Sequence, residues 1–349
     1  MSGKAMTDKP WWHPARHEGR RPALLARARL QTALRLWFAD EGFLEVDPAA
    51  LQTSPGNEAH LHAFATEVLD EAGQGRPMYL HTSPEFALKK LLAAGETRIF
   101  ALTHVFRNRE QTRRHAPEFT MLEWYRVGED YSRLMRDSME LLRLACLAAG
   151  TSLLSWQGRT CDPALTPERL TVAEAIARHT GIDLLGSISP DGTTNTAALA
   201  AQMTAKGLRV APDDTWSDLF SALLVLVEPH LGQGRVTLLD HYPAAEAALA
   251  RRVAGDARLA ERFELYACGV ELANGFGELT DAAEQRRRFE AEMDEKQRVY
   301  GDRYPLDLDF LAALAIMPAA AGIALGFDRL VMLATHAPHI EDVIWTPVA

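Results

Sequence analysis

The sequence has few cysteines and no long apolar segment. Its three cysteines, Cys146, Cys161 and Cys268, are odd in number and far apart among 349 residues. They therefore predict neither a disulfide framework nor a CxxC metal site, and they fit a reducing cytosol. Near the N-terminus, the stretch PALLARARL is interrupted by arginines before a signal-peptide core could form, and no other segment approaches a membrane span. We expect a cytoplasmic protein without membrane association.

An excess of positive charge is also missing. The formal net charge is -10, whereas a surface that covers a nucleic-acid backbone needs clustered Lys and Arg. We therefore expect no stable tRNA binding. The sequence contains no internal repeat or low-complexity tract. Its 47% hydrophobic and 24% charged residues are typical of a soluble globular protein with one large domain or two ordinary ones.

The most informative stretch is VFRNREQTRRHAPEFTMLEWYR, residues 105–126. It predicts a strand through Arg107, a polar and basic turn over residues 109–115, and a returning strand over residues 119–124. A long arginine-bearing loop is typical of a site that binds an anion. The alternative is a solvated loop whose arginines pair with neighbouring glutamates, and residue types alone leave both interpretations open.

Upstream of this hairpin, the pattern predicts two helices with an adjoining strand. Apolar residues at helical spacing predict a helix from Leu24 to Gly42, followed by a strand over residues 43–46, after a flexible tail of residues 1–22. A second strand near residues 78–82 leads into a helix, for which Ser83 suits the N-cap. Glu85 then lies where the helix dipole favours a carboxylate.

Acidic residues recur in RFELYACGVELANGFGE, residues 262–278. Two short strands around Cys268–Gly269 and a turn at Asn274–Gly275 would bring three glutamates together. Close carboxylates repel one another unless a cation is present, although each could instead be a solvated charge on an edge strand. The three are Glu264, Glu271 and Glu278.

The last element, AGIALGFDRLVML at residues 321–333, predicts a small-residue strand followed by a helix from about Asp328. Gly322 and Gly326 would let a flat group approach the backbone, and Arg329 could lay its guanidinium over that group. Between this element and the hairpin, residues 150–230 predict a small helical insertion, with helices over residues 172–179 and 216–227.

The strings Phe-Arg-Asn at 106–108 and His-x-Pro-Glu-Phe-Thr-Met-Leu-Glu-Trp-Tyr at 115–125 resemble the second signature motif of class II aminoacyl-tRNA synthetases in its lysyl-type form. The helix and strand before Pro48 resemble the first motif, and residues 321–333 resemble the third. The resemblance implies an α+β fold, a class II synthetase catalytic domain with an antiparallel sheet flanked by helices over residues 23–349. It also implies a homodimer.

The core begins close to the N-terminus, so we expect no anticodon-binding domain. This layout resembles the elongation factor P lysine ligase family, and Ala324, where lysyl-tRNA synthetases have glycine, supports the narrower resemblance. The resemblance implies ATP-dependent activation of lysine or (R)-β-lysine as an adenylate, followed by transfer to a lysine side chain of elongation factor P. Two alternatives are a lysyl-type core that charges tRNA and a non-catalytic regulatory subunit.

The resemblance also implies the site residues. The amino acid would be bound by Ser83, Glu85, Glu123, Tyr125, Asn274, Glu278 and Ala324. ATP would be bound by Arg107, Asn108, Arg109, His115, Phe119, Glu271, Leu272, Gly326 and Arg329, with Mg²⁺ on Glu264 and Glu271. Two positions depart from the family pattern: Arg109 replaces a glutamate, for which Glu110 could substitute, and Ala116 replaces an asparagine.

Overall fold

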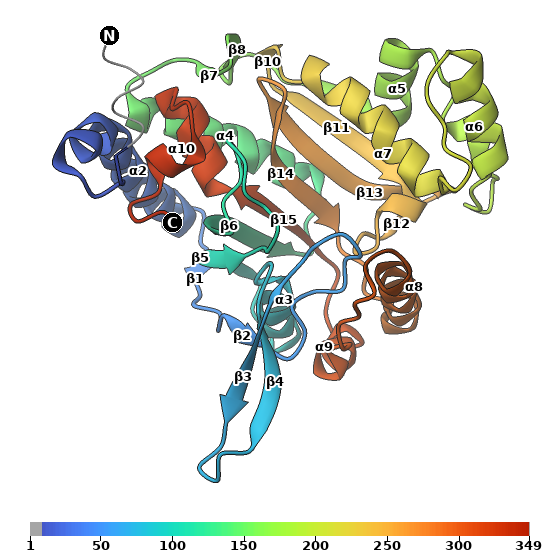
Figure 1. Cartoon of the computed structure of the whole chain (residues 1–349), viewed down its shortest axis with the longest axis horizontal. Coiled ribbons are helices and arrows are strands. Elements are labelled where there is room, and N and C mark those ends of the chain that lie inside the picture. Colours follow the sequence, from blue (N-terminus) through green and yellow to red (C-terminus); the bar gives the residue numbers. More distant parts are fainter. Residues whose placement is uncertain (1–8, 349) are drawn as a thin grey trace.

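The computed structural model of the chain describes residues 9–348, and its centre is a nine-stranded β-sheet (Figure 1). The strand order is β1-β5-β6-β15-β14-β13-β11-β9, and β12 pairs with β13. The β1/β5 and β9/β11 pairs are parallel, and the other pairs are antiparallel. The predicted α+β fold, with a mainly antiparallel sheet flanked by helices, is confirmed. The strands are β1 (Leu44–Glu45), β5 (Arg98–Phe106), β6 (Glu118–Val127), β9 (Glu168–Thr171), β11 (Thr237–Pro243), β12 (Arg252–Val253), β13 (Asp256–Ala267), β14 (Val270–Gly277) and β15 (Ala320–Gly326).

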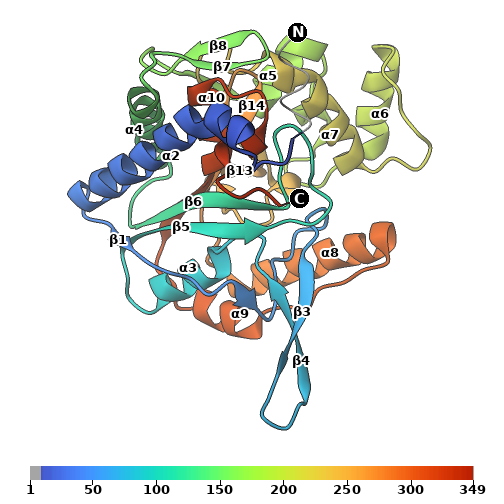
Figure 2. The same ribbon diagram turned by 60° about the vertical axis from the view of Figure 1, so that its left-hand side comes forward.

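Two smaller three-stranded sheets lie outside this centre. One contains β2 (Leu51–Gln52), β3 (Phe64–Leu69) and β4 (Gly75–Leu80), and its β3–β4 hairpin projects from the body of the molecule (Figures 1 and 2). The other contains β7 (Leu154–Trp156), β8 (Arg159–Asp162) and β10 (Gly234–Arg235).

Three helices cover one face of the central sheet: α2 (Pro14–Asp40), α4 (Ser132–Ala149) and α10 (Phe327–Thr335) (Figure 2). Alternate residues of β6 and β15, among them Trp124 and Ile323, point into this apolar core. On the opposite face, a second apolar core joins α3 (Glu85–Ala93), α8 (Ala282–Tyr300) and α9 (Leu308–Leu314) to β5. The sheet is therefore buried on both faces at this end.

The first helix begins earlier than its sequence predicts. The structure has residues 14–22 in α2, so the predicted tail is wrong for them, and the part of that prediction on residues 1–8 lies outside the described residues. Pro22 inside the helix would normally end it. Long-range contacts compensate: buried Arg20 donates to the carbonyl of Glu341 over 2.8 Å, and buried Arg27 pairs with Asp328.

The β5–β6 and β13–β14 hairpins carry two of the sequence motifs. The β5–β6 hairpin is confirmed, with Phe106 opposite Glu118. The β13–β14 strands are longer than predicted, and residues 274–275 lie inside β14, so the predicted turn there is wrong. The chain turns only at residues 268–269, which both have φ in the left-handed range, as a two-residue hairpin turn requires.

The region between α4 and β11 contains helices and short strands. The helices predicted over 172–179 and 216–227 are confirmed as α5 (Val172–Thr180) and α7 (Trp216–Val227), each begun by a capping box. Around them lie α6 (Thr196–Ala205), η1 (Leu185–Ser187) and η2 (Glu228–His230). These elements share an apolar core of their own, and β9 joins them to the edge of the central sheet.

Short helical turns complete the chain at η3 (Ala244–Glu246) and η4 (Ile340–Val343). No helix within residues 9–348 has both the length and the apolar character that crossing a bilayer requires.

Candidate active site

Four neighbouring strands place polar and small residues in one row across a face of the central sheet. Glu264 on β13 lies opposite Asn274 on β14, and Asn274 lies opposite Ala324 on β15. Ala324 in turn lies opposite Glu123 on β6. Residues directly opposite one another in antiparallel strands have their side chains on the same face. The strand register alone therefore gathers four of the predicted site residues.

The next row of this face has a position that only glycine fits. Gly322 on β15 lies opposite Tyr125 on β6. A Cβ atom at Gly322 would lie 2.2 Å from a ring carbon of Tyr125 and 2.3 Å from Oε1 of Glu278, both far inside van der Waals contact. The glycine thus lets Tyr125 and Glu278 lie against the strand.

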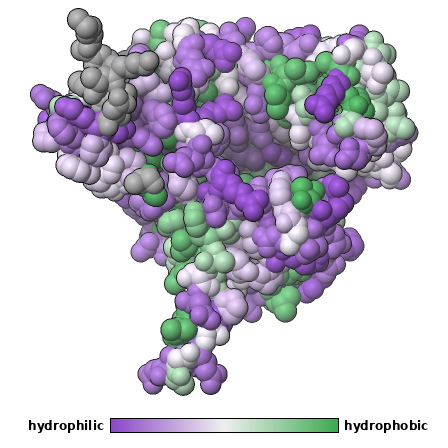
Figure 3. Space-filling view, in the orientation of Figure 1, coloured by the Kyte–Doolittle hydropathy of each residue, from purple (hydrophilic) through white to green (hydrophobic). Residues whose placement is uncertain are grey.

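A cavity of about 150 Å³ lies over this face, beside the β5–β6 loop and the first residues of α3 and α10. In the space-filling view, hydrophilic residues surround a hollow in the middle of the molecule (Figure 3). The structure brings these predicted residues into the cavity wall: Ser83, Glu85, Arg107, His115, Phe119, Glu271, Leu272, Asn274, Ala324, Gly326 and Arg329.

One wall of the cavity is cationic. The guanidinium of Arg107 lies over the ring of Phe119, 5.4 Å from its centre, and Nε donates to the carbonyl of Thr82 over 3.2 Å. Burial, with Arg329, Arg114 and Arg107 close by, lowers the pKa of His115 to about 3. The imidazole is therefore neutral at physiological pH, and the positive charge belongs to the guanidinium groups. This wall suits a phosphate group.

Arg329 forms the side of this wall nearest β14. Its Nη1 donates to the backbone carbonyl of Glu271 over 3.0 Å and lies 3.5 Å from the Glu271 carboxylate. Its Nε donates to the carbonyl of Arg114 over 3.4 Å. Arg329 thus links β14 and the β5–β6 loop, which fixes its guanidinium at the cavity.

The acidic cluster differs from the predicted one. Glu264 accepts hydrogen bonds from Arg262 and Tyr266, each over 2.7 Å. Desolvation raises the pKa of Glu271, and the neighbouring Glu264 adds to that rise. Glu278 lies elsewhere, because seven residues of extended chain after Glu271 span roughly 23 Å.

The third carboxylate near Glu264 and Glu271 is that of Glu228. Burial raises its pKa, and Glu264 raises it further. Within residues 9–348, no three His, Cys, Asp or Glu side chains are arranged to hold a metal ion by themselves. Mg²⁺ usually takes one or two protein carboxylates together with substrate phosphates. Glu271 lines the cavity beside the cationic wall, and Glu264 lies outside the cavity wall but close enough to raise the pKa of Glu271. This pair of carboxylates fits that requirement.

A buried lysine occupies the acidic end of the site. The ammonium of Lys89 on α3 lies 2.6 Å from Oε2 of Glu278 and also pairs with Glu85. The side chains of Lys89 and Glu278 are 1% and 0% exposed. Burial disfavours the charged form of Lys89, but the two carboxylates outweigh this and raise its pKa. Burial raises the pKa of Glu278 to about 7.

Glu123 lies beside this ion pair and is held by two hydroxyl groups. Tyr125 donates to its Oε1 over 2.6 Å, and Ser83 donates to its Oε2 over 2.7 Å. Burial, with Glu85 close by, raises the pKa of Glu123 to about 8. The predicted N-cap at Ser83 is wrong by one residue, because α3 begins at Glu85 and its N-cap is Pro84. The Ser83 hydroxyl still accepts a hydrogen bond from the Glu85 amide.

The wall of the cavity does not include Glu123, Tyr125 or Glu278. Glu85 lines the cavity and is close to the carboxylates of both Glu123 and Glu278, so it links this buried group to the cavity.

Two of the predicted ATP-binding residues do not reach the cavity. Asn108 bonds to the following amide and pairs with His62. Arg109 has φ of 65°, and its guanidinium lies 5.9 Å from the ring centre of Tyr300. The left-handed turn at this residue instead leaves Glu110 in the cavity wall, together with Ala116. Glu110 therefore lies where it can substitute for the glutamate that the family pattern has at position 109.

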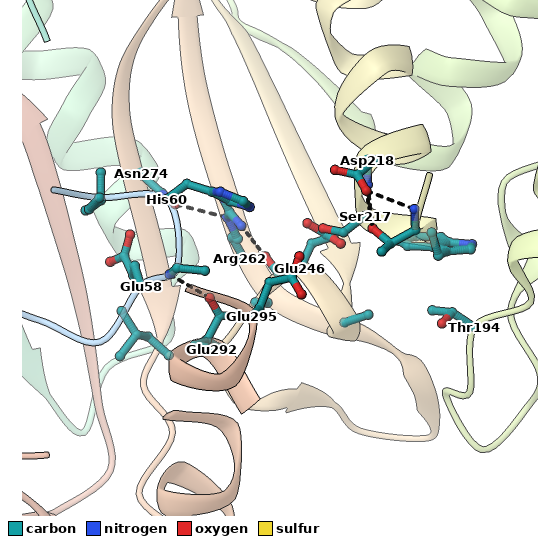
Figure 4. A pocket seen from close by; sticks show the side chains of 18 of the residues that line it. Glu58, His60, Thr194, Ser217, Asp218, Glu246, Arg262, Asn274, Glu292 and Glu295 are labelled. Carbon is teal, nitrogen blue, oxygen red and sulfur yellow. Dashed lines mark hydrogen bonds between the residues drawn. The ribbon is translucent and has the colours of Figure 1, made fainter. Parts of the chain in front are cut away.

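A second cavity, of about 540 Å³, adjoins the first (Figure 4). It lies between the N-terminus of α7, η3 and α8, and its wall contains more acidic than basic residues. Three residues line both cavities: Glu58, Asn274 and Phe276. The two cavities therefore meet at the row of site residues on β14.

Sequence reasoning missed Lys89, Glu58 and Arg114. The spacing of Lys89, four residues after Glu85 in a helix, could have identified the ion pair. Arg114 lies in the predicted anion-binding loop, so the reasoning that identified that loop also identifies Arg114 as a candidate site residue. No local signal marks Glu58, because its position depends on the contacts of the loop with α8.

Comparison of the sequence with known proteins identifies the family of this chain. Residues 6–349 match the family of class II tRNA synthetases (D, K and N). The chain is 40% identical over 341 residues to the elongation factor P–(R)-β-lysine ligase of Salmonella arizonae, which covers 97% of this chain and 98% of the relative. It is 40% identical to the protein of that name from Salmonella paratyphi A and 39% identical to that from Salmonella paratyphi B, with the same coverage. The chain belongs to the class II (D, K and N) tRNA synthetase family, and within it to the relatives named elongation factor P–(R)-β-lysine ligase.

Proposed function

We propose that this enzyme activates lysine or (R)-β-lysine with ATP as an aminoacyl adenylate and transfers it to a lysine side chain of elongation factor P. The names of the relatives support this function. The observation that carries it is that Glu85 lines the cavity beside the cationic wall and also pairs with Lys89 in the buried acidic network. One site thus offers partners for a phosphate and for an amine.

In this mechanism, the cationic wall binds ATP. Arg107 contacts the α-phosphate and the amino-acid carboxylate, which holds the attacking oxygen in line with phosphorus. Phe119 and Arg329 bind the adenine. Mg²⁺ held by Glu264 and Glu271 would offset the charge that develops on the pyrophosphate.

The acidic network selects an amino acid with two ammonium groups. When Glu85, Glu123, Glu278 and Lys89 are all ionised, three carboxylates and one ammonium leave two uncompensated negative charges. The two ammonium groups of lysine or β-lysine match that charge. Glu123 and Glu85 receive one amine, and Tyr125 with Glu278 receives the other, which requires the network to open toward the cavity.

The second cavity supplies a path for the acceptor. A lysine side chain that enters it approaches the adenylate through the junction at Asn274 and Phe276. The carboxylates of Glu246 and Glu292 in its wall favour a cationic segment. This arrangement supports a protein acceptor with an exposed lysine.

A homodimer is also proposed. Leu36 on α2 and Leu44 on the edge strand β1 are 62% and 53% exposed. Exposed apolar side chains of this kind are typical of a surface that a second chain covers. Light scattering of the purified protein at micromolar concentration tests this: a mass of one chain at all concentrations excludes the dimer.

Intact-mass analysis tests the acceptor and the amino acid together. Purified elongation factor P and, separately, total tRNA are incubated with the enzyme, ATP, Mg²⁺ and either α-lysine or (R)-β-lysine. We expect elongation factor P to gain the mass of one lysyl group. A lysyl group on tRNA, with elongation factor P unmodified, would instead identify a tRNA synthetase. If neither amino acid causes ATP consumption, the result would favour a non-catalytic regulatory protein.

A further inference from the structure

The proposed transfer has an unsolved chemical step. A lysine amine has a pKa of about 10.4, so at pH 7 only about one in 2,500 is neutral and able to attack. Amide formation on elongation factor P therefore needs a base beside the incoming amine. That base must face the path of the acceptor and the adenylate at the same time.

Glu58 is the residue that meets this requirement. Among the three residues that line both cavities it is the titratable one, since the others are Asn274 and Phe276. Figure 4 shows Glu58 close to Asn274 at the junction. An amine that passes from the second cavity into the first therefore passes the Glu58 carboxylate.

The backbone of Glu58 is fixed by α8. The amide of Ala59 donates to the Glu292 carboxylate over 2.9 Å, a contact drawn in Figure 4. The buried ammonium of Lys296 donates to the carbonyls of Ala59 and Leu61 over 3.1 and 2.7 Å. The loop is thus held at the residues that follow Glu58, while the side chain remains directed toward the cavities.

The Glu58 carboxylate is free to accept a proton. Within the described chain it has neither a hydrogen-bond nor an ion-pair partner, whereas Glu85 pairs with Lys89, Glu295 pairs with Arg298, and Glu292 accepts from the backbone. Glu110 in the wall of the first cavity likewise has no partner among the described residues, but it does not line the second cavity. Glu58 is therefore distinguished by being an unpartnered carboxylate at the junction of the two cavities.

Four charged groups face Glu58 from the surrounding elements. They are Arg107 after β5, Glu85 on α3, Glu292 on α8 and Arg262 on β13. Glu58 is exposed to solvent where it lines the two cavities. Partial desolvation by the protein packed around the cavities, assisted by the two glutamates and opposed by the two arginines, raises the pKa of Glu58 to about 7. A general base works best with a pKa near the working pH.

We propose that Glu58 is the general base of the transfer step, which rests on the proposed function. The Glu58 carboxylate takes one proton from the acceptor ammonium. The neutral amine then attacks the carbonyl carbon of the adenylate, the new C–N bond forms, and the bond from that carbon to the phosphate oxygen breaks, so that AMP leaves with the electron pair. The remaining extra proton on nitrogen goes to the phosphate or to water.

The variant Glu58→Gln tests the proposal, because it keeps the shape and removes the base. We expect the single-turnover rate of transfer to elongation factor P at pH 7 to fall by about 100-fold, within the usual range for loss of a general base. Amino-acid-dependent pyrophosphate exchange should fall by less than about threefold. With hydroxylamine, which is uncharged at neutral pH, the variant should form hydroxamate at a rate close to that of the wild type.

The pH profile separates proton transfer from simple attraction of a cation. The wild-type transfer rate should rise toward pH 7, where Glu58 ionises, and then level off. The rate of Glu58→Gln should instead rise about tenfold per pH unit to pH 9, as the amine loses its own proton. The control Glu295→Gln removes a charge from the same cavity; it should raise the KM for elongation factor P and keep the wild-type pH profile and kcat.

Three results would overturn the assignment. The first is an unchanged transfer rate in Glu58→Gln, and the second is an equal loss of rate with hydroxylamine. The third is a loss of pyrophosphate exchange as large as the loss of transfer, which would make Glu58 a binding residue. A wild-type enzyme that shows no exchange with either lysine isomer contradicts the proposed function itself, so the two failures are distinguishable.

Discussion

Replacement of Lys89 by methionine removes a buried cation while keeping most of the apolar side chain. Lys89 and Glu278 are both almost fully buried, and the ammonium also pairs with Glu85. Breaking a buried ion pair typically costs about 3–5 kcal/mol, because the remaining charge has no partner. We expect the free energy of unfolding of Lys89→Met to fall by about that amount near pH 8.5.

The loss should depend on pH. The raised pKa of Lys89 means that its stabilising effect is present throughout the range below about pH 10. In the variant, Glu278 loses its cation, so its pKa rises further above the value of about 7. A carboxyl group with a raised pKa destabilises the fold progressively as pH rises above its unfolded pKa of about 4.3. Protonation relieves this, so the loss should be smaller near pH 5.5.

Urea unfolding at both pH values measures the effect, with Lys90→Met as a matched control. Lys90 is the next residue of α3 and pairs with Asp307 over 2.6 Å. Asp307 is 3% exposed, but the Lys90 side chain is 32% exposed, so water screens the pair from one side. Its replacement should cost only about 1 kcal/mol, with little change between the two pH values. Equal losses for the two variants, or a loss for Lys89→Met that does not vary with pH, would refute the reasoning.

Three further predictions concern the site. Arg107→Ala should lower pyrophosphate exchange by about 100-fold or more at unchanged thermal stability, and near-normal exchange would remove this arginine from the phosphate site. Gly322→Ala should destabilise the fold by roughly 1–3 kcal/mol and raise the KM for the amino acid more than that for ATP, because the new methyl group would overlap Tyr125 and Glu278. The KM for lysine should fall as pH rises from 6 to 9, since Glu123, whose pKa is about 8, must ionise to bind an ammonium; a KM that is constant over this range would show that Glu123 binds no amine.

The motif strings predicted the local elements of the site. The β5–β6 hairpin and the helix after β15 follow from patterns within about 20 residues, and the structure has both. Arg107 and Arg329 reach one cavity as predicted. Short-range periodicity and turn chemistry are sufficient here, because each element satisfies its own backbone hydrogen bonds.

Long-range contacts account for the errors. The predicted tail of residues 1–22 is wrong for residues 14–22, because α2 includes them and continues through Pro22 while Arg20 and Arg27 bind the C-terminal region. The three glutamates at 264, 271 and 278 were predicted to lie together in space, but the extended strand β14 places Glu278 far from the other two. Its partner, Lys89, comes from a helix almost 190 residues earlier.

The sequence by itself determined the family motifs, the order of the main elements and most residues of the phosphate-binding wall. Only the tertiary structure decided which carboxylates share a cation, that Arg109 lies outside the cavity, and that Glu58 stands where two cavities meet. The physical reason is that strand register and helix packing set the distances between residues far apart in the chain. The charge state of each buried acid depends on those distances rather than on its neighbours in sequence.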